Sequence, residues 1–157
     1  FSYLTLTIPN KKKITLYDCF DKYTEKEVMD GDNKVTNEKT SKKEDCTKQL
    51  MFFSLPQVLI IVLKRFGNNL RRKNNMVNIP LANLDLNKYV VGYQDRNTTY
   101  NLYGVCNHIG NHEGGHYTSY VKVRDGKWYH FNDRSVTHYT GDLITPNSYC
   151  LFYRKKN

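Results

Sequence analysis

The sequence predicts an α+β fold, in which one short helix is segregated from a longer series of strands. Apolar residues recur with helical spacing only near residues 16–23. From residue 58 onward they form short runs bounded by turn residues, a pattern typical of strands. A helix at one end of several consecutive strands favours an antiparallel sheet. With 157 residues, the chain has the size of one domain or of a large piece of one.

The first predicted element is a short amphipathic helix that begins after Thr15. Four residues fall at helical positions i, i+3, i+4 and i+7: Leu16, Cys19, Phe20 and Tyr23. Their shared stripe indicates a helix that packs against the core. Residues 30–48 follow as a polar, charged stretch with almost no apolar side chains. We expect this stretch to be either a solvent-exposed excursion or a poorly ordered loop.

A series of strands is predicted to follow. The run VLIIVLKRF, Val58 to Phe66, is almost continuously apolar and β-branched, which predicts a buried central strand. Pro56 stands at its entrance, where a missing N–H does least harm. Four further strands are expected at Tyr100–Asn107, Tyr117–Val123, Lys127–Phe131 and Tyr149–Tyr153.

Charge and cysteine content exclude several classes of function. The net charge is +9, yet the unmatched basic residues gather at 64–73 and 154–156, and no nucleic-acid-binding motif accompanies them. No apolar run approaches the roughly 20 residues of a membrane span. We therefore expect neither a nucleic-acid nor a membrane partner. Four scattered cysteines without a C-x-x-C pair fit a reducing compartment, so cytoplasm or nucleus is the expected location.

Residues able to do chemistry concentrate between 107 and 136. Gly114 and Gly115 precede His116, and adjacent glycines allow a ligand backbone to approach closely. His116 opens a predicted strand that turns near residues 125–126 and returns with Asn132 and Asp133. A histidine beside an amide or a carboxylate supplies a general base and the group that orients it. Such a pair still needs a nucleophile.

The hairpin register decides which residue orients His116, and the sequence permits two registers. If Asp125 and Gly126 form a two-residue loop, Asp133 shares the face of His116. If the loop has three residues, with Gly126 in the left-handed conformation, Asn132 shares that face instead. Either partner can hold the imidazole, although only a carboxylate adds negative charge. Both residues therefore remain candidates.

Five segments in order carry a resemblance to a known family. They are FSYLTLTIP with ITLYDCFDKYTEKEVMDGDNK, LPQVLIIVLKRF, VNIPLANLDLNKY, YNLYGVCNHIGNHEGGHYTSYVKVRDGKWYHFNDRSVT and NSYCLFYRK. Together they resemble the C-terminal half of the catalytic domain of ubiquitin-specific proteases, which are deubiquitinating cysteine proteases. The resemblance implies that residues 1–157 are part of one papain-like catalytic domain, with an antiparallel palm sheet, a fingers extension at about 30–48 and a catalytic hairpin at about 107–136.

The resemblance also implies roles for individual residues. His116 is expected to be the general base, Asn132 the third catalytic residue and Asp133 a nearby carboxylate. The loop from 108 to 115 resembles a mobile loop over the ubiquitin tail. The residues expected to contact that tail are His108, Glu113, Gly114, Gly115 and Tyr117.

Two departures from the family pattern shape the expected chemistry. The nucleophilic cysteine of the family lies in an N-terminal Cys box that this sequence lacks, and Cys19, Cys46, Cys106 and Cys150 are not convincing substitutes. In the fingers, the second zinc-binding pair would fall near Asn37 and Thr40, which are not plausible ligands. We therefore expect no metal or other cofactor, and a thiolate supplied by an absent N-terminal segment.

The expected function is thiol-dependent hydrolysis of isopeptide or peptide bonds at the C-terminal glycine of ubiquitin. The expected partners are ubiquitin or ubiquitinated proteins, together with the N-terminal half of the same catalytic domain. The alternative is a non-catalytic ubiquitin-binding half-domain or a pseudoenzyme. Retention of Gly114, Gly115, His116 and Asn132 together favours the enzyme.

Overall fold

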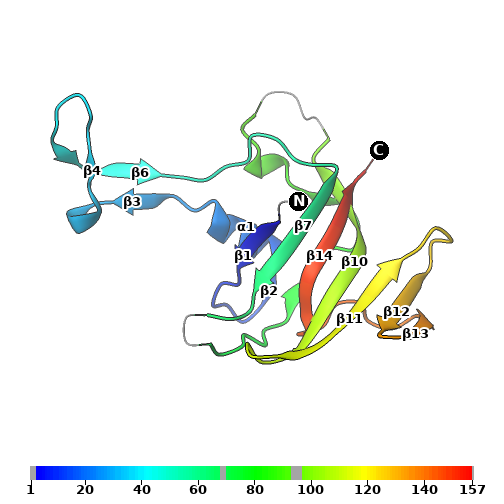
Figure 1. The fold of residues 1–157 in the computed structure, drawn as a ribbon. Coiled ribbons are helices and arrows are strands. Elements are labelled where there is room, and N and C mark those ends of the chain that lie inside the picture. Colours follow the sequence, from blue (N-terminus) through cyan, green and yellow to red (C-terminus); the bar gives the residue numbers. More distant parts are fainter. Residues whose placement is uncertain (1–2, 68–69, 93–96, 157) are drawn as a thin grey trace.

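A mixed β-sheet forms the body of the molecule (Figure 1). The computed structural model describes residues 3–67, 70–92 and 97–156. The order of the principal strands across the sheet is β1 (Leu4–Thr7), β7 (Val58–Lys64), β14 (Ser148–Lys155), β10 (Thr99–Gly110), β11 (Gly115–Lys122), β12 (Trp128–Asn132) and β13 (Ser135–Tyr139). A short strand, β9 (Leu84–Asp85), pairs with β10. The sheet is antiparallel from β7 to β13 as predicted, whereas β1 pairs with β7 in parallel.

The smaller elements lie around this sheet. One α-helix, α1 (Leu16–Tyr23), follows β2 (Ile14–Thr15), and β2 pairs in parallel with β8 (Val77–Asn78). A 3-10 turn, η2 (Asn87–Tyr89), precedes β10. The structure agrees with the predicted α+β class, although it is mostly β with few helical elements. Among the described residues, no helix is long and apolar enough to cross a membrane.

The charged stretch forms an arm that projects from the sheet (Figure 1). Its base is a ladder of β3 (Glu27–Met29) with β6 (Cys46–Lys48), and its tip contains η1 (Gly31–Asn33) and the pair β4 (Val35–Thr36) and β5 (Lys43–Glu44). Most of its side chains are exposed. The prediction of an exposed excursion is confirmed, and the alternative of a poorly ordered loop is wrong, because two short ladders satisfy much of the backbone.

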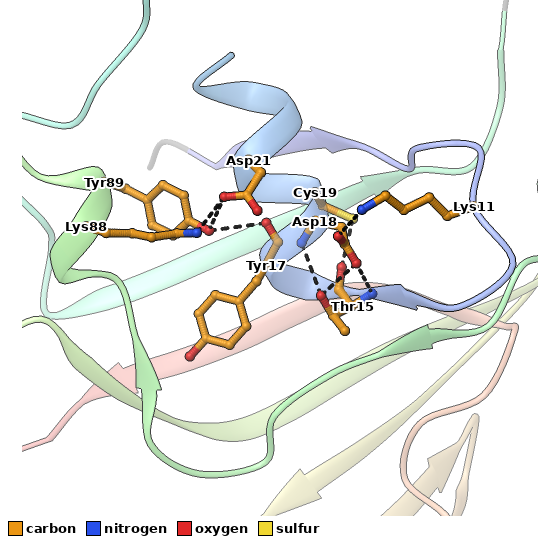
Figure 2. A network of polar contacts seen from close by, with 8 residues as sticks. All are labelled: Lys11, Thr15, Tyr17, Asp18, Cys19, Asp21, Lys88 and Tyr89. Atoms are coloured by element: carbon orange, nitrogen blue, oxygen red, sulfur yellow. Dashed lines mark hydrogen bonds and ion pairs between the residues drawn. The ribbon is translucent and has the colours of Figure 1, made fainter.

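Helix α1 begins where the sequence predicts because Thr15 caps it. The Thr15 hydroxyl accepts from the Asp18 backbone N–H at 3.2 Å, and the Asp18 carboxylate accepts from the Thr15 N–H at 2.8 Å. This reciprocal arrangement is a capping box, and Lys11 adds an ion pair to Asp18 (Figure 2). The cap thus stabilises the first turn of a helix too short to be stable alone.

A second polar contact fixes the chain after β9 to α1. The Tyr89 hydroxyl donates to the Asp21 carboxylate at 2.9 Å, and Lys88 forms an ion pair with Asp21 at 2.7 Å (Figure 2). The Tyr89 ring itself is buried and packs against Phe20, with 5.1 Å between the ring centroids. Residues far apart in the sequence are therefore joined by both an apolar and a polar contact.

The core lies on one face of the sheet. Leu59, Ile61 and Leu63 of β7 are buried with the apolar stripe of α1. The alternate residues Ile60 and Val62 are only half-buried. The predicted strand therefore lies inside the sheet as expected, but only one of its two faces is fully buried. A continuous apolar run hides the alternation that would have distinguished the two faces.

The capping box makes stability pH-dependent. Hydrogen bonds from Lys11 and Thr15 lower the pKa of Asp18 from 3.8 to about 2. Because the folded-state pKa is the lower one, the carboxylate stabilises the fold above about pH 4, and this contribution is lost as the pH falls through 2. We expect Asp18→Asn to lower the free energy of unfolding at pH 7 by about 1 kcal/mol, with the difference shrinking between pH 4 and 2.

Urea unfolding at several pH values measures this difference. The control is Asp32→Asn, which changes an exposed carboxylate that has no hydrogen-bond or ion-pair partner among the described residues. It should alter stability by less than about 0.5 kcal/mol at every pH. Equal pH dependence for Asp18→Asn and the unmodified protein would contradict this account of the cap.

Candidate active site

His116 and Asn132 are hydrogen-bonded across neighbouring strands. The His116 Nε2 atom lies 2.6 Å from the Asn132 Oδ1 atom. His116 is on β11 and Asn132 ends β12, and Tyr120 pairs directly with His130 between these strands. Side chains alternate between faces with a period of two, so His116 and Asn132 share the face of Tyr120 and His130. The strand register thus places the amide beside the imidazole.

A three-residue turn sets this register. The Val123 N–H donates to the Lys127 carbonyl at 3.0 Å, which leaves residues 124–126 as the loop. Gly126 has φ of +80°, in the left-handed region. The Asp125 carboxylate accepts from the Lys127 N–H at 2.8 Å and closes the turn. Of the two registers that the sequence permits, the structure contains the three-residue form, with Asn132 on the face of His116.

Asp133 lies outside this hydrogen bond. It occupies the turn between β12 and β13, with φ of 50°, and its side chain is exposed. Within the described part of the chain, its carboxylate has no hydrogen-bond or ion-pair partner. A negative charge in this exposed turn is screened by water, so its influence on the imidazole is weaker than that of the contacting amide.

The hydrogen bond defines which imidazole nitrogen is available as a base. An Asn Oδ1 atom only accepts, so the His116 Nε2 atom carries the proton in this arrangement. The Nδ1 atom then holds the free lone pair. His116 is exposed while Asn132 is half-buried, so a supported base faces open space. An exposed imidazole with a free Nδ1 lone pair can act as a general base and take a proton from a group that another part of the protein or a substrate supplies.

A cleft of 330 Å³ lies at the start of β11 and contains all five residues predicted to contact the ubiquitin tail. His108, Glu113, Gly114, Gly115 and Tyr117 line it. Phe66 and Tyr149 complete its aromatic wall, and sequence reasoning missed both. The His108 ring lies 4.7 Å from that of Tyr117 and 5.8 Å from those of Phe66 and Tyr149, measured between centroids.

Glycines shape the mouth of the cleft. A Cβ atom on Gly115 would lie 2.4 Å from the Ile109 carbonyl oxygen and 2.5 Å from the His108 Nε2 atom, so a side chain there requires displacement of the backbone. A Cβ atom on Gly114 would meet nothing within 4 Å. Gly115 therefore permits close packing of β10 and β11, while Gly114 leaves open space beside the cleft.

Two arginines hold the cleft wall in place. Buried Arg65 donates to the carbonyl oxygens of Ser148 at 2.7 Å, Lys73 at 2.9 Å and Asn75 at 3.0 Å. Arg72 donates to the His108 carbonyl at 2.8 Å. Burial and the charge of Arg72 lower the pKa of His108, which keeps this imidazole neutral near pH 7. The cleft wall is therefore aromatic and uncharged at its base.

None of the four cysteines lies near His116 on the same face of the sheet. Cys19 is buried in α1, and Cys46 belongs to the projecting arm. In the β10–β11 register, Ile109 pairs with His116 while Cys106 pairs with Ser119. An odd offset between 109 and 106 places Cys106 on the opposite face of the sheet from His116. Cys150 pairs with Cys106 and shares that opposite face.

The described residues contain no group of three or more His, Cys, Asp or Glu side chains positioned to hold a metal ion. The chemistry that the arrangement itself supports is proton transfer by His116, with Asn132 fixing its orientation. A histidine base held by an asparagine beside a cleft is the arrangement of thiol hydrolases of the Cys-His-Asn class.

Comparison with known proteins identifies the family. Residues 7–153 match the family described as ubiquitin carboxyl-terminal hydrolase. Ubiquitin carboxyl-terminal hydrolase 2 of Gallus gallus is 37% identical over 157 residues, covering 96% of this chain and 44% of that protein. Its Homo sapiens counterpart is 36% identical over 157 residues, covering 94% and 26%. Ubiquitin carboxyl-terminal hydrolase 15 of Homo sapiens is 34% identical over 154 residues, covering 95% and 16%.

The chain therefore belongs to the ubiquitin carboxyl-terminal hydrolase family, which confirms the resemblance to ubiquitin-specific proteases. The family implies a papain-like fold, and the mostly β architecture agrees with it. The chain spans less than half the length of each of these relatives.

The two glycines of the cleft should respond differently to the same substitution. We expect Gly115→Ala to lower the free energy of unfolding by about 1–3 kcal/mol, because the added methyl group overlaps the Ile109 carbonyl. Gly114→Ala is the matched control and should change stability by less than about 0.5 kcal/mol. Thermal or urea unfolding measures both. Equal effects at the two positions would refute the packing described for β10 and β11.

Proposed function

We propose that this chain supplies the general base and its orienting amide to a thiol-dependent deubiquitinase acting in the cytoplasm or nucleus. The reaction is hydrolysis of the isopeptide or peptide bond after the C-terminal glycine of ubiquitin. The 2.6 Å contact between the His116 Nε2 atom and the Asn132 Oδ1 atom carries the proposal. Membership of the family and the names of its relatives support the choice of ubiquitin as substrate.

In the proposed mechanism, His116 acts twice. Its Nδ1 atom first takes the proton of a cysteine thiol, and the thiolate attacks the carbonyl carbon of the terminal glycine. The imidazolium then gives the proton to the leaving amine, which leaves an acyl-enzyme. Water, deprotonated by the same nitrogen, hydrolyses the acyl-enzyme and releases the thiol. Asn132 holds the Nε2–H throughout and so keeps Nδ1 aimed at the reacting atoms.

The cleft beside His116 is the proposed binding site for the ubiquitin tail. Gly114 leaves open space where an extended substrate backbone can approach, and Tyr117 and His108 provide an aromatic wall. Glu113 is exposed at the rim, where its carboxylate can accept hydrogen bonds from the tail. Because His116 and Tyr117 point to opposite faces of β11, the tail must turn past the two glycines to bring its carbonyl to the base.

The nucleophile is proposed to come from a segment outside this chain. On this view residues 1–157 are the C-terminal part of one catalytic domain, with fingers at about 30–48 and the catalytic hairpin at about 107–136. The N-terminal part, carrying the cysteine, is then the principal partner besides ubiquitin. Two observations favour this arrangement: Cys106 lies on the opposite face from His116, and His116 itself is exposed.

The alternative is a non-catalytic ubiquitin-binding half-domain or a pseudoenzyme. Its supporting observation is that no cysteine of the described residues shares the face and neighbourhood of His116. The intact His116–Asn132 hydrogen bond argues for the enzyme, since binding alone does not require an oriented base.

The two candidate orienting residues should differ in their effect on turnover. With the upstream segment supplied, Asn132→Ala is expected to lower kcat by about 100-fold, because the imidazole loses its partner. Asp133→Ala is expected to lower kcat by less than about tenfold, because its carboxylate lies in an exposed turn. Hydrolysis of a fluorogenic C-terminal amide of ubiquitin measures kcat. A larger loss for Asp133→Ala would reverse the assignment.

The source of the nucleophile can be tested with ubiquitin that carries a thiol-reactive group at its C-terminus. The chain alone should form no covalent adduct, and addition of the upstream segment should produce one on a cysteine of that segment. An adduct on Cys106 or another cysteine of this chain would contradict the proposed division. Binding of ubiquitin without any adduct, even with both parts present, would favour the non-catalytic alternative.

A further inference from the structure

Two cysteines outside the candidate active site face each other across adjacent strands. Cys106 on β10 pairs directly with Cys150 on β14 in antiparallel register. Both are free thiols and both are half-buried. Directly opposite residues in an antiparallel pair have Cα atoms about 4.5 or 5.5 Å apart. Both values lie within the range of about 4.4–6.8 Å that a disulfide requires.

The two thiols have different acidities because they contact each other. A hydrogen bond from Cys150 lowers the pKa of Cys106 below its ordinary value of 9.0, against the opposing effect of burial. The same hydrogen bond, together with burial, raises the pKa of Cys150. Cys106 is therefore the more acidic of the two thiols, and the more readily converted to a thiolate. One nucleophilic sulfur and one neighbouring thiol are the two parts of a redox-active pair.

Cys106 borders a hollow in the surface of the sheet. A hollow of 410 Å³ on this face of the sheet is lined by Cys106, Ser119, Val121 and Phe152, among others. The face is the one opposite to His116, so the catalytic pair does not cover it. A small oxidant can reach Cys106 without rearrangement of the strands.

We propose that Cys106 and Cys150 are a redox modification site, which hydrogen peroxide converts into a cross-strand disulfide between β10 and β14. The Cys106 thiolate attacks one peroxide oxygen, the O–O bond breaks, and the departing hydroxide takes a proton to become water. Cys106 is then a sulfenic acid. The Cys150 sulfur attacks the Cys106 sulfur, the S–O bond breaks, and the second hydroxide leaves with the thiol proton as water. Two thiols lose two electrons in total, and one peroxide becomes two waters.

The crosslink would form at a functional position in the sheet. The register of β10 with β14 shifts between Cys106 and Asn107, immediately after the pair. The following residues of β10 lead into the loop that lines the cleft. A disulfide there ties the base of this loop to a central strand of the sheet. Half-buried disulfides are reducible, so the bond is expected to form under peroxide and to revert in a reducing compartment.

Peroxide treatment of the full, reduced chain tests the proposal without reference to hydrolase activity. Thiols titrated in denaturant should fall from four to two, and the intact mass should fall by about 2 Da through loss of two hydrogens. Dithiothreitol should reverse both changes, and a non-reduced digest should contain one fragment that joins Cys106 to Cys150. Cys106→Ser and Cys150→Ser should each abolish the change. Cys46→Ser, which alters a thiol of the projecting arm, should leave it intact.

The acidity of Cys106 provides a second, independent measurement. Its alkylation rate by iodoacetamide should show a pH midpoint clearly below 9.0, the ordinary pKa of a cysteine thiol. Cys150→Ser keeps a hydrogen-bond donor and should preserve this midpoint, whereas Cys150→Ala should move it toward 9.0. The proposal would be overturned if peroxide treatment left four thiols, or gave only sulfinic acid on Cys106, or gave only dimers linked through Cys46. It would also be overturned if the alkylation midpoint of Cys106 were unchanged in Cys150→Ala as well as in Cys150→Ser.

Discussion

The strand register between β11 and β12 is the constraint on which the candidate site depends. It is set by three residues, 124–126, in which Gly126 adopts a left-handed conformation and Asp125 closes the turn. With one residue fewer in the loop, every side chain of β12 would move to the other face. His116 would then face Asp133 instead of Asn132. A backbone conformation about ten residues from the base thus determines which group holds the imidazole.

The same alternation of side chains separates three candidate sites on the sheet. His116 and Asn132 occupy one face, and Tyr117 with His108 forms the aromatic cleft on the other. Cys106 on β10 and Cys150 on β14 lie farther along the sheet, on the face of that cleft. Between them on the chain, Gly115 allows close packing of β10 and β11, and Gly114 leaves open space. The core around α1 and β7 supports this arrangement but contributes none of its chemistry.

Local signals in the sequence predicted the elements that depend on local interactions. Thr15 and the helical stripe after it indicated α1, because capping and amphipathic spacing act within one turn. The sequence could not distinguish the two hairpin registers, since Asp125 and Gly126 suit both loop lengths. It also missed β1, a strand of four residues whose parallel pairing with β7 depends on contacts more than 50 residues away in the chain. Phe66 and Tyr149 were missed for the same reason, as only the folded sheet brings them to His108.

The central claim is that Asn132 holds His116 as the Nε2–H tautomer, with Nδ1 free to act as the base. Nitrogen-15 chemical shifts of the neutral His116 ring report the tautomer directly. The account predicts a protonated Nε2 in the unmodified chain, and a mixture of tautomers in Asn132→Ala but not in Asp133→Ala. A protonated Nδ1, or tautomer populations unaffected by Asn132→Ala, would contradict it.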